Sequence, residues 1–147
     1  MSRETAEGLT HYFQSLLDSE GFNKGQISWD DEASTSDLIF KVEGRGYILI
    51  ADADDTDFVR MMFPNFWSLD SDEEFAAALQ ALSIVNSRCK GTKVYANSSN
   101  NNVIATIEFL IDSDDPQLKS GLFLRYIRML NNAAEEFARV MREFNSQ

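Results

Sequence analysis

The sequence predicts an α+β fold in which three helices pack on one antiparallel sheet of five to six strands. Three observations support this. Apolar residues recur at helical spacing in three segments, shorter apolar runs lie between those segments, and turn residues join neighbouring runs without any β-α-β alternation. The predicted order is therefore one helix, three to four strands, a helix, two strands and a closing helix.

The first helix is predicted over residues 4–19. Leu9, Phe13 and Leu17 recur there at the spacing that places them on one side of a helix, and polar residues fall between them. Gly21 follows at the position where such a helix ends, because glycine adopts the left-handed backbone that closes a helix without steric cost.

A three-stranded region follows the first helix. Residues 26–29 form a short candidate strand, and the polar run 30–36 is expected to be a loop. The apolar runs 37–43 and 47–51 flank a short connection, Gly44-Arg45-Gly46. Two apolar runs joined by so few glycine-bearing residues predict a β-hairpin.

Residues 58–63 predict a further strand. Pro64 is expected to end it and to place it at a sheet edge, because proline cannot donate to the hydrogen-bond ladder.

The second helix is predicted over residues 72–88. Ser71 opens a capping-box pattern with acidic residues in the first turn, and Gly91 follows the end of the helix.

The last third of the chain predicts a second hairpin and a long helix. Residues 93–96 and 103–111 bracket the polar run 97–102, and alternation along 103–111 predicts one buried face and one wet face. The closing helix is predicted from about residue 117 to 144. Its apolar residues spread wider than one narrow stripe, so we expect it to cover more than one surface.

Composition limits the classes of function. A chain of 147 residues with 44% hydrophobic residues predicts a single domain over residues 1–147. No apolar stretch is long enough to span a membrane, and the polar start carries no readable targeting signal, so the cytoplasm is the expected compartment. The formal net charge of −11 disfavours nucleic acid and anionic membranes as partners.

No motif predicts a reaction. Four aspartates lie between residues 52 and 57, but a calcium loop beginning at Asp52 would need glycine and glutamate where Asp57 and Phe63 stand. His11 is expected on a helix surface or in packing, and Cys89 at a helix end, where the helix dipole opposes a thiolate. We therefore predict no catalytic, cofactor-binding or metal-binding residue and expect that the chain is not an enzyme.

The charges are distributed unevenly along the chain. Residues 1–85 carry five basic and 17 acidic side chains, a net −12, whereas residues 86–147 carry eight and seven, a net +1. This asymmetry has two interpretations. In the first, the acidic residues keep the protein in solution and the helix faces carry a balance of acidic and basic residues. In the second, an acidic surface is separated from a more neutral surface at which protomers or partners meet.

Methionine and aromatic residues gather around the proline. Most of them are expected in the core, but methionine and large aromatic side chains also make adaptable binding surfaces, and proline interrupts the ladder there. The candidate protein-binding residues are Met61, Phe63, Phe66 and Trp67.

Several segments together resemble the bacterial YbjN family. They are the run 81–86, the segment 93–95, the apolar strand 103–111 and the arginine-bearing helix from Arg125 to Leu130. Asn86 is the most family-like single position. The chain departs from the family in its overall acidity and in the longer polar turn of the second hairpin.

The resemblance implies a fold similar to type III secretion chaperones. It also implies a non-enzymatic cytoplasmic protein, a sensory-transduction or stress regulator, that binds other polypeptides and forms a homodimer. It carries over no catalytic or metal residues. The residues independently allow this function, since an edge strand can accept an added strand and a broad helix surface can pair with its twin.

An alternative function follows from the charge. An acidic immunity protein or antitoxin would neutralise a basic partner through the acidic half of the chain, and its association would slow as ionic strength rises.

Overall fold

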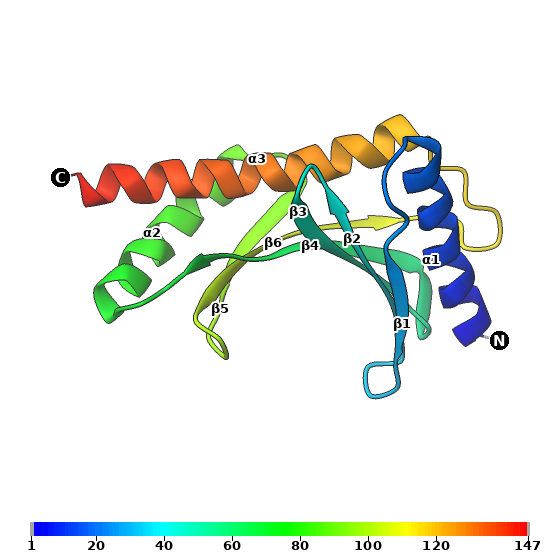
Figure 1. The fold of residues 1–147 in the computed structure, drawn as a ribbon. Helices are drawn as coiled ribbons and strands as arrows, with labels where there is room; N and C mark the ends of the chain where they lie inside the picture. The colour runs from blue at the N-terminus through cyan, green and yellow to red at the C-terminus, as the bar shows by residue number, and fades with distance from the viewer. Residues whose placement is uncertain (1, 147) are drawn as a thin grey trace. The chain divides into compact units, whose positions relative to one another are not determined.

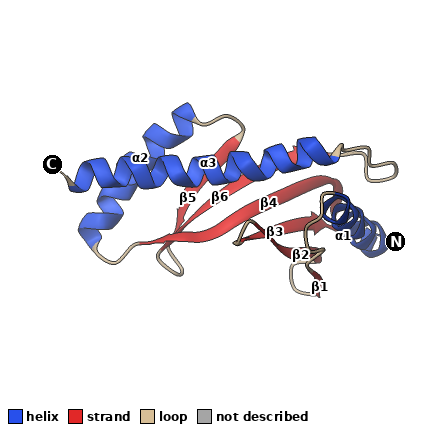
Figure 2. Ribbon diagram, turned by 45° about the horizontal axis from the view of Figure 1, so that its top comes forward, coloured by secondary structure: helices blue, strands red, loops and turns tan. Residues whose placement is uncertain are grey.

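The computed structural model describes residues 2–146 and contains three helices and a six-stranded sheet (Figures 1 and 2). The helices are α1 (Ser2–Ser19), α2 (Asp72–Arg88) and α3 (Ser120–Asn145), and the strands are β1 (Gln26–Asp30), β2 (Thr35–Val42), β3 (Arg45–Asp52), β4 (Asp55–Ser68), β5 (Thr92–Asn97) and β6 (Asn102–Leu110). The strand order is β1-β2-β3-β4-β6-β5. The predicted α+β class and order of elements are confirmed.

The chain divides into two compact units. Unit 1 comprises residues 2–61 and 108–125, and unit 2 comprises residues 62–107 and 126–146. The single domain predicted over residues 1–147 stays a prediction. Within residues 2–146, none of the helices combines the length and apolar character that crossing a bilayer requires.

In unit 1, α1 packs on β2 and β3 through the predicted apolar stripe. Phe13 is fully buried, and its ring lies 5.2 Å from that of Phe123 and 6.2 Å from that of Phe109. Beneath this aromatic layer the buried hydroxyls of Thr10 and Ser36 share a hydrogen bond of 2.8 Å, which satisfies both polar groups. Ser36 and Phe40 lie four residues apart on β2 and therefore on the same face of the sheet. The helices cover this face.

In unit 2, α2 begins where the capping-box pattern predicts, at Asp72 after the cap residue Ser71. The Ser71 hydroxyl accepts a hydrogen bond of 3.1 Å from the Glu74 backbone N–H. Near the other end of α2, Arg88 forms an ion pair of 3.2 Å with Glu136 of α3. The pair links the two helices, although exposed pairs of this kind contribute little stability.

The first hairpin turns more tightly than predicted. Val42 pairs with Arg45, so the turn is the two residues Glu43 and Gly44, and Arg45 with the residue after it belongs to β3. Both turn residues have left-handed backbone, with φ of 54° and 81°. Two successive left-handed residues are what a two-residue turn needs to match the twist of the flanking strands.

The predicted edge position of the strand before Pro64 is wrong. β4 has 14 residues against eight in β3 and lies between β3 and β6. Because the two strands are joined by a two-residue turn, Pro64 falls in the part of β4 that extends past β3, where its missing N–H leaves no bond to β3 unmade. Asn65 follows with a left-handed φ of 55°, and β4 continues past it to Ser68.

Two further predictions need correction. α3 begins at Ser120 and not at residue 117, because the Tyr12 hydroxyl binds both the N–H and the carbonyl of Leu118 at 2.9 Å and keeps that backbone out of the helix. In β6 the whole stretch 103–107 is buried, including Thr106 on the face predicted to be wet.

Candidate protein-binding surfaces

The predicted aromatic group is largely packed against α3. Phe66 stacks on Phe63 at 5.5 Å between ring centroids, and Phe66 and Trp67 both meet the fully buried ring of Phe137 edge-on, at 5.8 Å and 5.7 Å. Met61 has no exposed surface and belongs to unit 1. This geometry is typical of core packing, in which the rings gain stability from burial and from each other.

Trp67 is also held by a hydrogen bond. Its indole N–H donates to a Glu74 carboxylate oxygen at 2.9 Å, and the other oxygen of that carboxylate accepts from the Asp70 backbone N–H at 3.2 Å. The indole is therefore tied to the start of α2. Binding of a partner by the group Met61, Phe63, Phe66 and Trp67 stays a prediction.

Asn86 covers the outer edge of β5. Its side-chain amide donates to the Val94 carbonyl at 2.9 Å, and its amide oxygen accepts from the Val94 N–H at 2.8 Å. An edge strand offers unpaired backbone groups to any passing strand. Here the α2 side chain occupies both groups of Val94, so this part of the edge is closed to an added strand.

We expect Asn86→Ala to lower the free energy of unfolding by about 1–3 kcal/mol, because it leaves two backbone groups without partners. Native-state hydrogen exchange should show faster exchange at the Val94 amide. Asn86→Asp keeps the acceptor and should retain part of that protection, whereas Ser87→Ala, at an exposed neighbour, should change neither quantity. Equal protection of Val94 in wild type and Asn86→Ala would contradict this role.

The uncovered face of unit 1 carries exposed apolar side chains. Alternation places them opposite the buried residues of their strands: Ile39 and Ile48 are cross-strand partners, and Leu110 lies opposite Phe109, which contacts α1. Ile39 is 52% exposed and Leu110 78% exposed. Three further apolar residues of this face, Ile48, Ile50 and Phe58, are half-buried. We call the five residues together the open-face patch: Ile39, Ile48, Ile50, Phe58 and Leu110.

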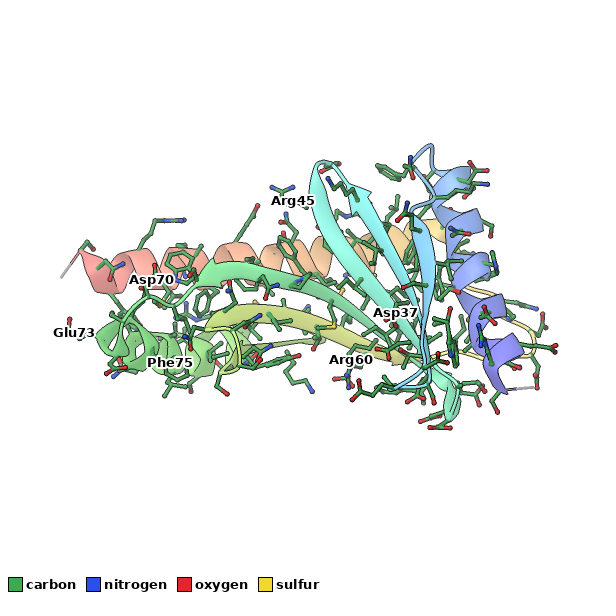
Figure 3. All side chains as sticks on the ribbon, turned by 60° about the horizontal axis from the view of Figure 1, so that its bottom comes forward. Asp37, Arg45, Arg60, Asp70, Glu73 and Phe75 are labelled. Carbon is green, nitrogen blue, oxygen red and sulfur yellow. The ribbon has the colours of Figure 1, made fainter. Side chains whose placement is uncertain are left out.

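Charged residues surround the open-face patch. Arg60 forms an ion pair of 3.5 Å with Glu108, and its guanidinium lies 6.0 Å from the Phe58 ring. Asp37 stands opposite Ile50 in the β2–β3 ladder. Figure 3 shows Asp37 and Arg60 among the side chains of these strands.

The pKa of the Asp37 carboxyl is raised above its ordinary value. Partial burial raises it, a hydrogen bond from Thr35 opposes this shift, and nearby Asp30 raises the pKa further.

We expect Asp37→Asn to stabilise the protein at neutral pH and to change its stability little near pH 3. A carboxyl whose pKa is raised by folding binds its proton more tightly in the folded state, so its stabilising contribution exists at low pH and is lost as pH rises through the folded pKa. Urea denaturation of variant and wild type at roughly pH 3 and pH 7 measures the difference. A variant that is less stable than wild type at pH 7 would contradict the burial argument.

Three acidic loops meet at one end of unit 1. The Ala53 N–H donates to the Ser34 carbonyl at 3.0 Å, which joins the β1–β2 loop to the β3–β4 turn. Ser113, after β6, donates to the Asp57 carboxylate through its N–H at 3.1 Å and its hydroxyl at 2.9 Å, and these bonds lower the Asp57 pKa. The carboxylates of this acidic end are Asp30, Asp31, Glu32, Asp52, Asp54, Asp55, Asp57, Asp112, Asp114 and Asp115.

The charge asymmetry along the sequence becomes a difference between the units. Unit 1 contains 17 acidic and seven basic residues, a net charge of −10, and unit 2 contains seven and six, a net charge of −1. Among residues 2–146, no three or more His, Cys, Asp or Glu side chains lie close enough to hold a metal ion. The carboxylates of the acidic end are therefore spread out and do not converge on one site.

Two solved structures are similar to this chain over nearly its whole length. The first is an uncharacterised protein from Methanothermobacter thermautotrophicus, with a TM-score of 0.62 and 15% identity over 97% of this chain and 98% of that one. The second is YbjN from E. coli, a candidate transcription regulator, with a TM-score of 0.52 and 13% identity over 92% of this chain and 90% of that one. The chain has a YbjN-like fold.

The resemblance read from the sequence is confirmed at the level of the fold. No family model matches the chain, and no curated protein sequence matches it. The descriptions of the two similar structures name no enzyme. In this YbjN-like fold, Asn86, the position that the resemblance singled out, joins α2 to the edge of β5.

The remaining candidates occupy structural positions in the YbjN-like fold. His11 lies exposed on α1. Cys89 ends α2, and its thiol has a raised pKa, first because of burial and then because of Glu136. A raised pKa keeps the thiol protonated and poorly nucleophilic.

Sequence reasoning missed the open-face patch. The apolar runs of β2 and β3 predicted a hairpin, and nothing in that pattern tells which face of the sheet a helix covers. The available signal was that both strands carry isoleucine on the face opposite their bulkier core residues, which makes them apolar on both sides.

Proposed function

We propose that this chain is a non-enzymatic protein-binding module of the cytoplasm that acts through protein contacts, and that the open-face patch makes the contact. The supporting observation is the exposure of Ile39 and Leu110 on the sheet face opposite the α1 layer. Scattered apolar residues on a surface need no explanation, but a group of them on one uncovered sheet face is typical of interaction sites. The candidate regulator with the same fold agrees with a regulatory role.

The aromatic group is a weaker candidate for the same function. Its rings already pack on α3, so a partner would have to compete with Phe137 for them. The chaperone-like activity needs an exposed surface too, and the open-face patch offers one without disturbing the core. The proposed homodimer would need a different surface, because two units that each carry a net charge of −10 repel each other.

Photo-crosslinking in cells of the native host tests the proposal. A benzophenone amino acid is placed at Leu110, and in a matched control at Leu79, which is 55% exposed on α2 of unit 2. We expect a discrete protein adduct from position 110 and none from position 79. An adduct of twice 16.7 kDa would identify the partner as a second copy.

Two outcomes would contradict the proposal. The first is that position 110 gives no adduct although the protein is folded and expressed. The second is that position 79 gives the same adduct with equal yield, because the crosslink would then report general proximity and not a binding face.

An acidic immunity protein or antitoxin is the second candidate function. The observation that favours it is the concentration of net charge, −10, in unit 1. It predicts that the adduct from position 110 is a toxic basic protein whose activity this chain suppresses, which a growth assay with both proteins would measure.

A further inference from the structure

We propose that the open face of unit 1 binds an amphipathic helix of another protein, with lysine or arginine beside its apolar stripe. This inference rests on the proposed function, because it names the kind of partner for the same surface.

The apolar row has the dimensions of a helix stripe. It runs from Ile39 on β2 across β3 and β4 to Leu110 on β6, which is three steps between neighbouring strands. At about 4.8 Å per step the row is roughly 14 Å long. An α-helix rises about 1.5 Å per residue, so about 10 residues, or three turns, cover that length.

A helix is the element that a sheet face normally receives. The opposite face already carries α1 and the first turn of α3, through Phe13 and Phe123. A sheet face that is apolar but uncovered reaches the usual layered arrangement when a helix packs on it. The outer edge of β5 is closed by Asn86 at Val94, so addition of a strand there is disfavoured.

The charges around the row select a basic partner. Cross-strand pairing puts Asp30, Asp37 and Asp52 on the open face, since Asp30 and Asp52 both pair with Thr35 and Asp37 lies two residues further along β2. The basic residues on this face are fewer, and one of them, Arg60, is paired with Glu108. The face therefore carries net negative charge, and two of its carboxylates, Asp30 and Asp52, also belong to the ten carboxylates of the acidic end.

The same charges disfavour a second copy as the occupant. Two open faces in contact would bring together two units that each carry a net charge of −10. Like charges of this size repel at low ionic strength, whereas a basic helix is attracted and its association is accelerated.

Fluorescence anisotropy with two synthetic helices tests the inference on the full chain. Each peptide has about 14 residues with leucine at helical spacing; one carries lysine at the remaining positions and its twin carries glutamate. We expect the Leu/Lys peptide to bind at least about tenfold more tightly than the Leu/Glu twin, and to bind more weakly as salt rises from roughly 50 to roughly 300 mM.

Variants locate the site. The double variant Ile39→Ser and Leu110→Ser removes exposed apolar side chains and should weaken binding of the Leu/Lys peptide about tenfold, without loss of stability. Leu79→Ser, at a leucine of similar exposure in unit 2, should bind as the wild type does. Asp37→Asn should weaken binding less than the double variant, while Glu73→Gln on α2 should leave it unchanged.

Equal weakening by Leu79→Ser and the double variant would overturn the inference, because the peptide would then bind acidic protein without a site. Equal affinity for the Leu/Glu twin would overturn it too. In either case a specific adduct from position 110 would still support the proposed function with a different partner. The absence of that adduct contradicts the proposed function whatever the peptides show.

Discussion

Replacing Phe137 with alanine is expected to lower the free energy of unfolding by about 3–5 kcal/mol. The side chain is fully buried on α3, and the rings of Phe66 and Trp67 meet it edge-on at 5.8 Å and 5.7 Å. Its removal leaves a cavity that those two rings can fill only by leaving their own contacts. Urea or guanidinium denaturation, followed by tryptophan fluorescence, would measure the loss.

The matched control is Leu79→Ala on α2. Leu79 is 55% exposed, so its truncation should change stability by less than about 0.5 kcal/mol. A loss below about 1 kcal/mol for Phe137→Ala would show that Phe66 and Trp67 are not packed on α3. That result would return the aromatic group to the position of leading candidate for partner binding.

Replacing Gly25 with alanine is expected to cost about 3 kcal/mol or more, because two independent penalties combine there. The residue has a left-handed φ of 73°, and an added Cβ would overlap the carbonyl oxygen of Ile39 and lie 2.9 Å from the Cβ of Phe40. The chain entering β1 would have to move away from β2. Thermal denaturation and loss of amide protection in β1 would report this change.

Gly21→Ala separates the two penalties. Gly21 also has a left-handed φ, of 82°, but an added Cβ there meets nothing within 4 Å. It should therefore cost only the backbone term, about 1–2 kcal/mol. Equal losses for Gly21→Ala and Gly25→Ala would contradict the close approach of residue 25 to β2.

The elements that were predicted well are those whose signals are local. The Ser71–Glu74 capping box placed the start of α2, and the spacing of Leu9, Phe13 and Leu17 identified the buried side of α1. In each case the chemistry that decides the structure lies within a few residues along the chain. For the same reason α2, whose cap and end are both local, was predicted with the bounds that the structure shows.

The errors share a different origin. The start of α3 was placed three residues early because the hydroxyl of Tyr12, more than a hundred residues away, binds the backbone of Leu118. The position of β4 within the sheet depends on β6, which no local pattern around Pro64 reveals. Thr106 is buried, although its polarity predicted that it lies on a solvent-exposed face of the sheet.

The sequence by itself determined the class of fold, the order of its elements and the excess of acid in the chain, since spacing, caps, turns and charge are properties of the residues themselves. Only the tertiary structure decided which apolar residues stay in water. Ile39 and Phe40 are both large apolar residues and neighbours in the chain, yet Ile39 is 52% exposed, whereas Phe40 is buried against Phe123 of α3. The physical reason is that a strand presents its side chains to both faces of the sheet, and burial depends on which face the helices, distant in the chain, come to cover.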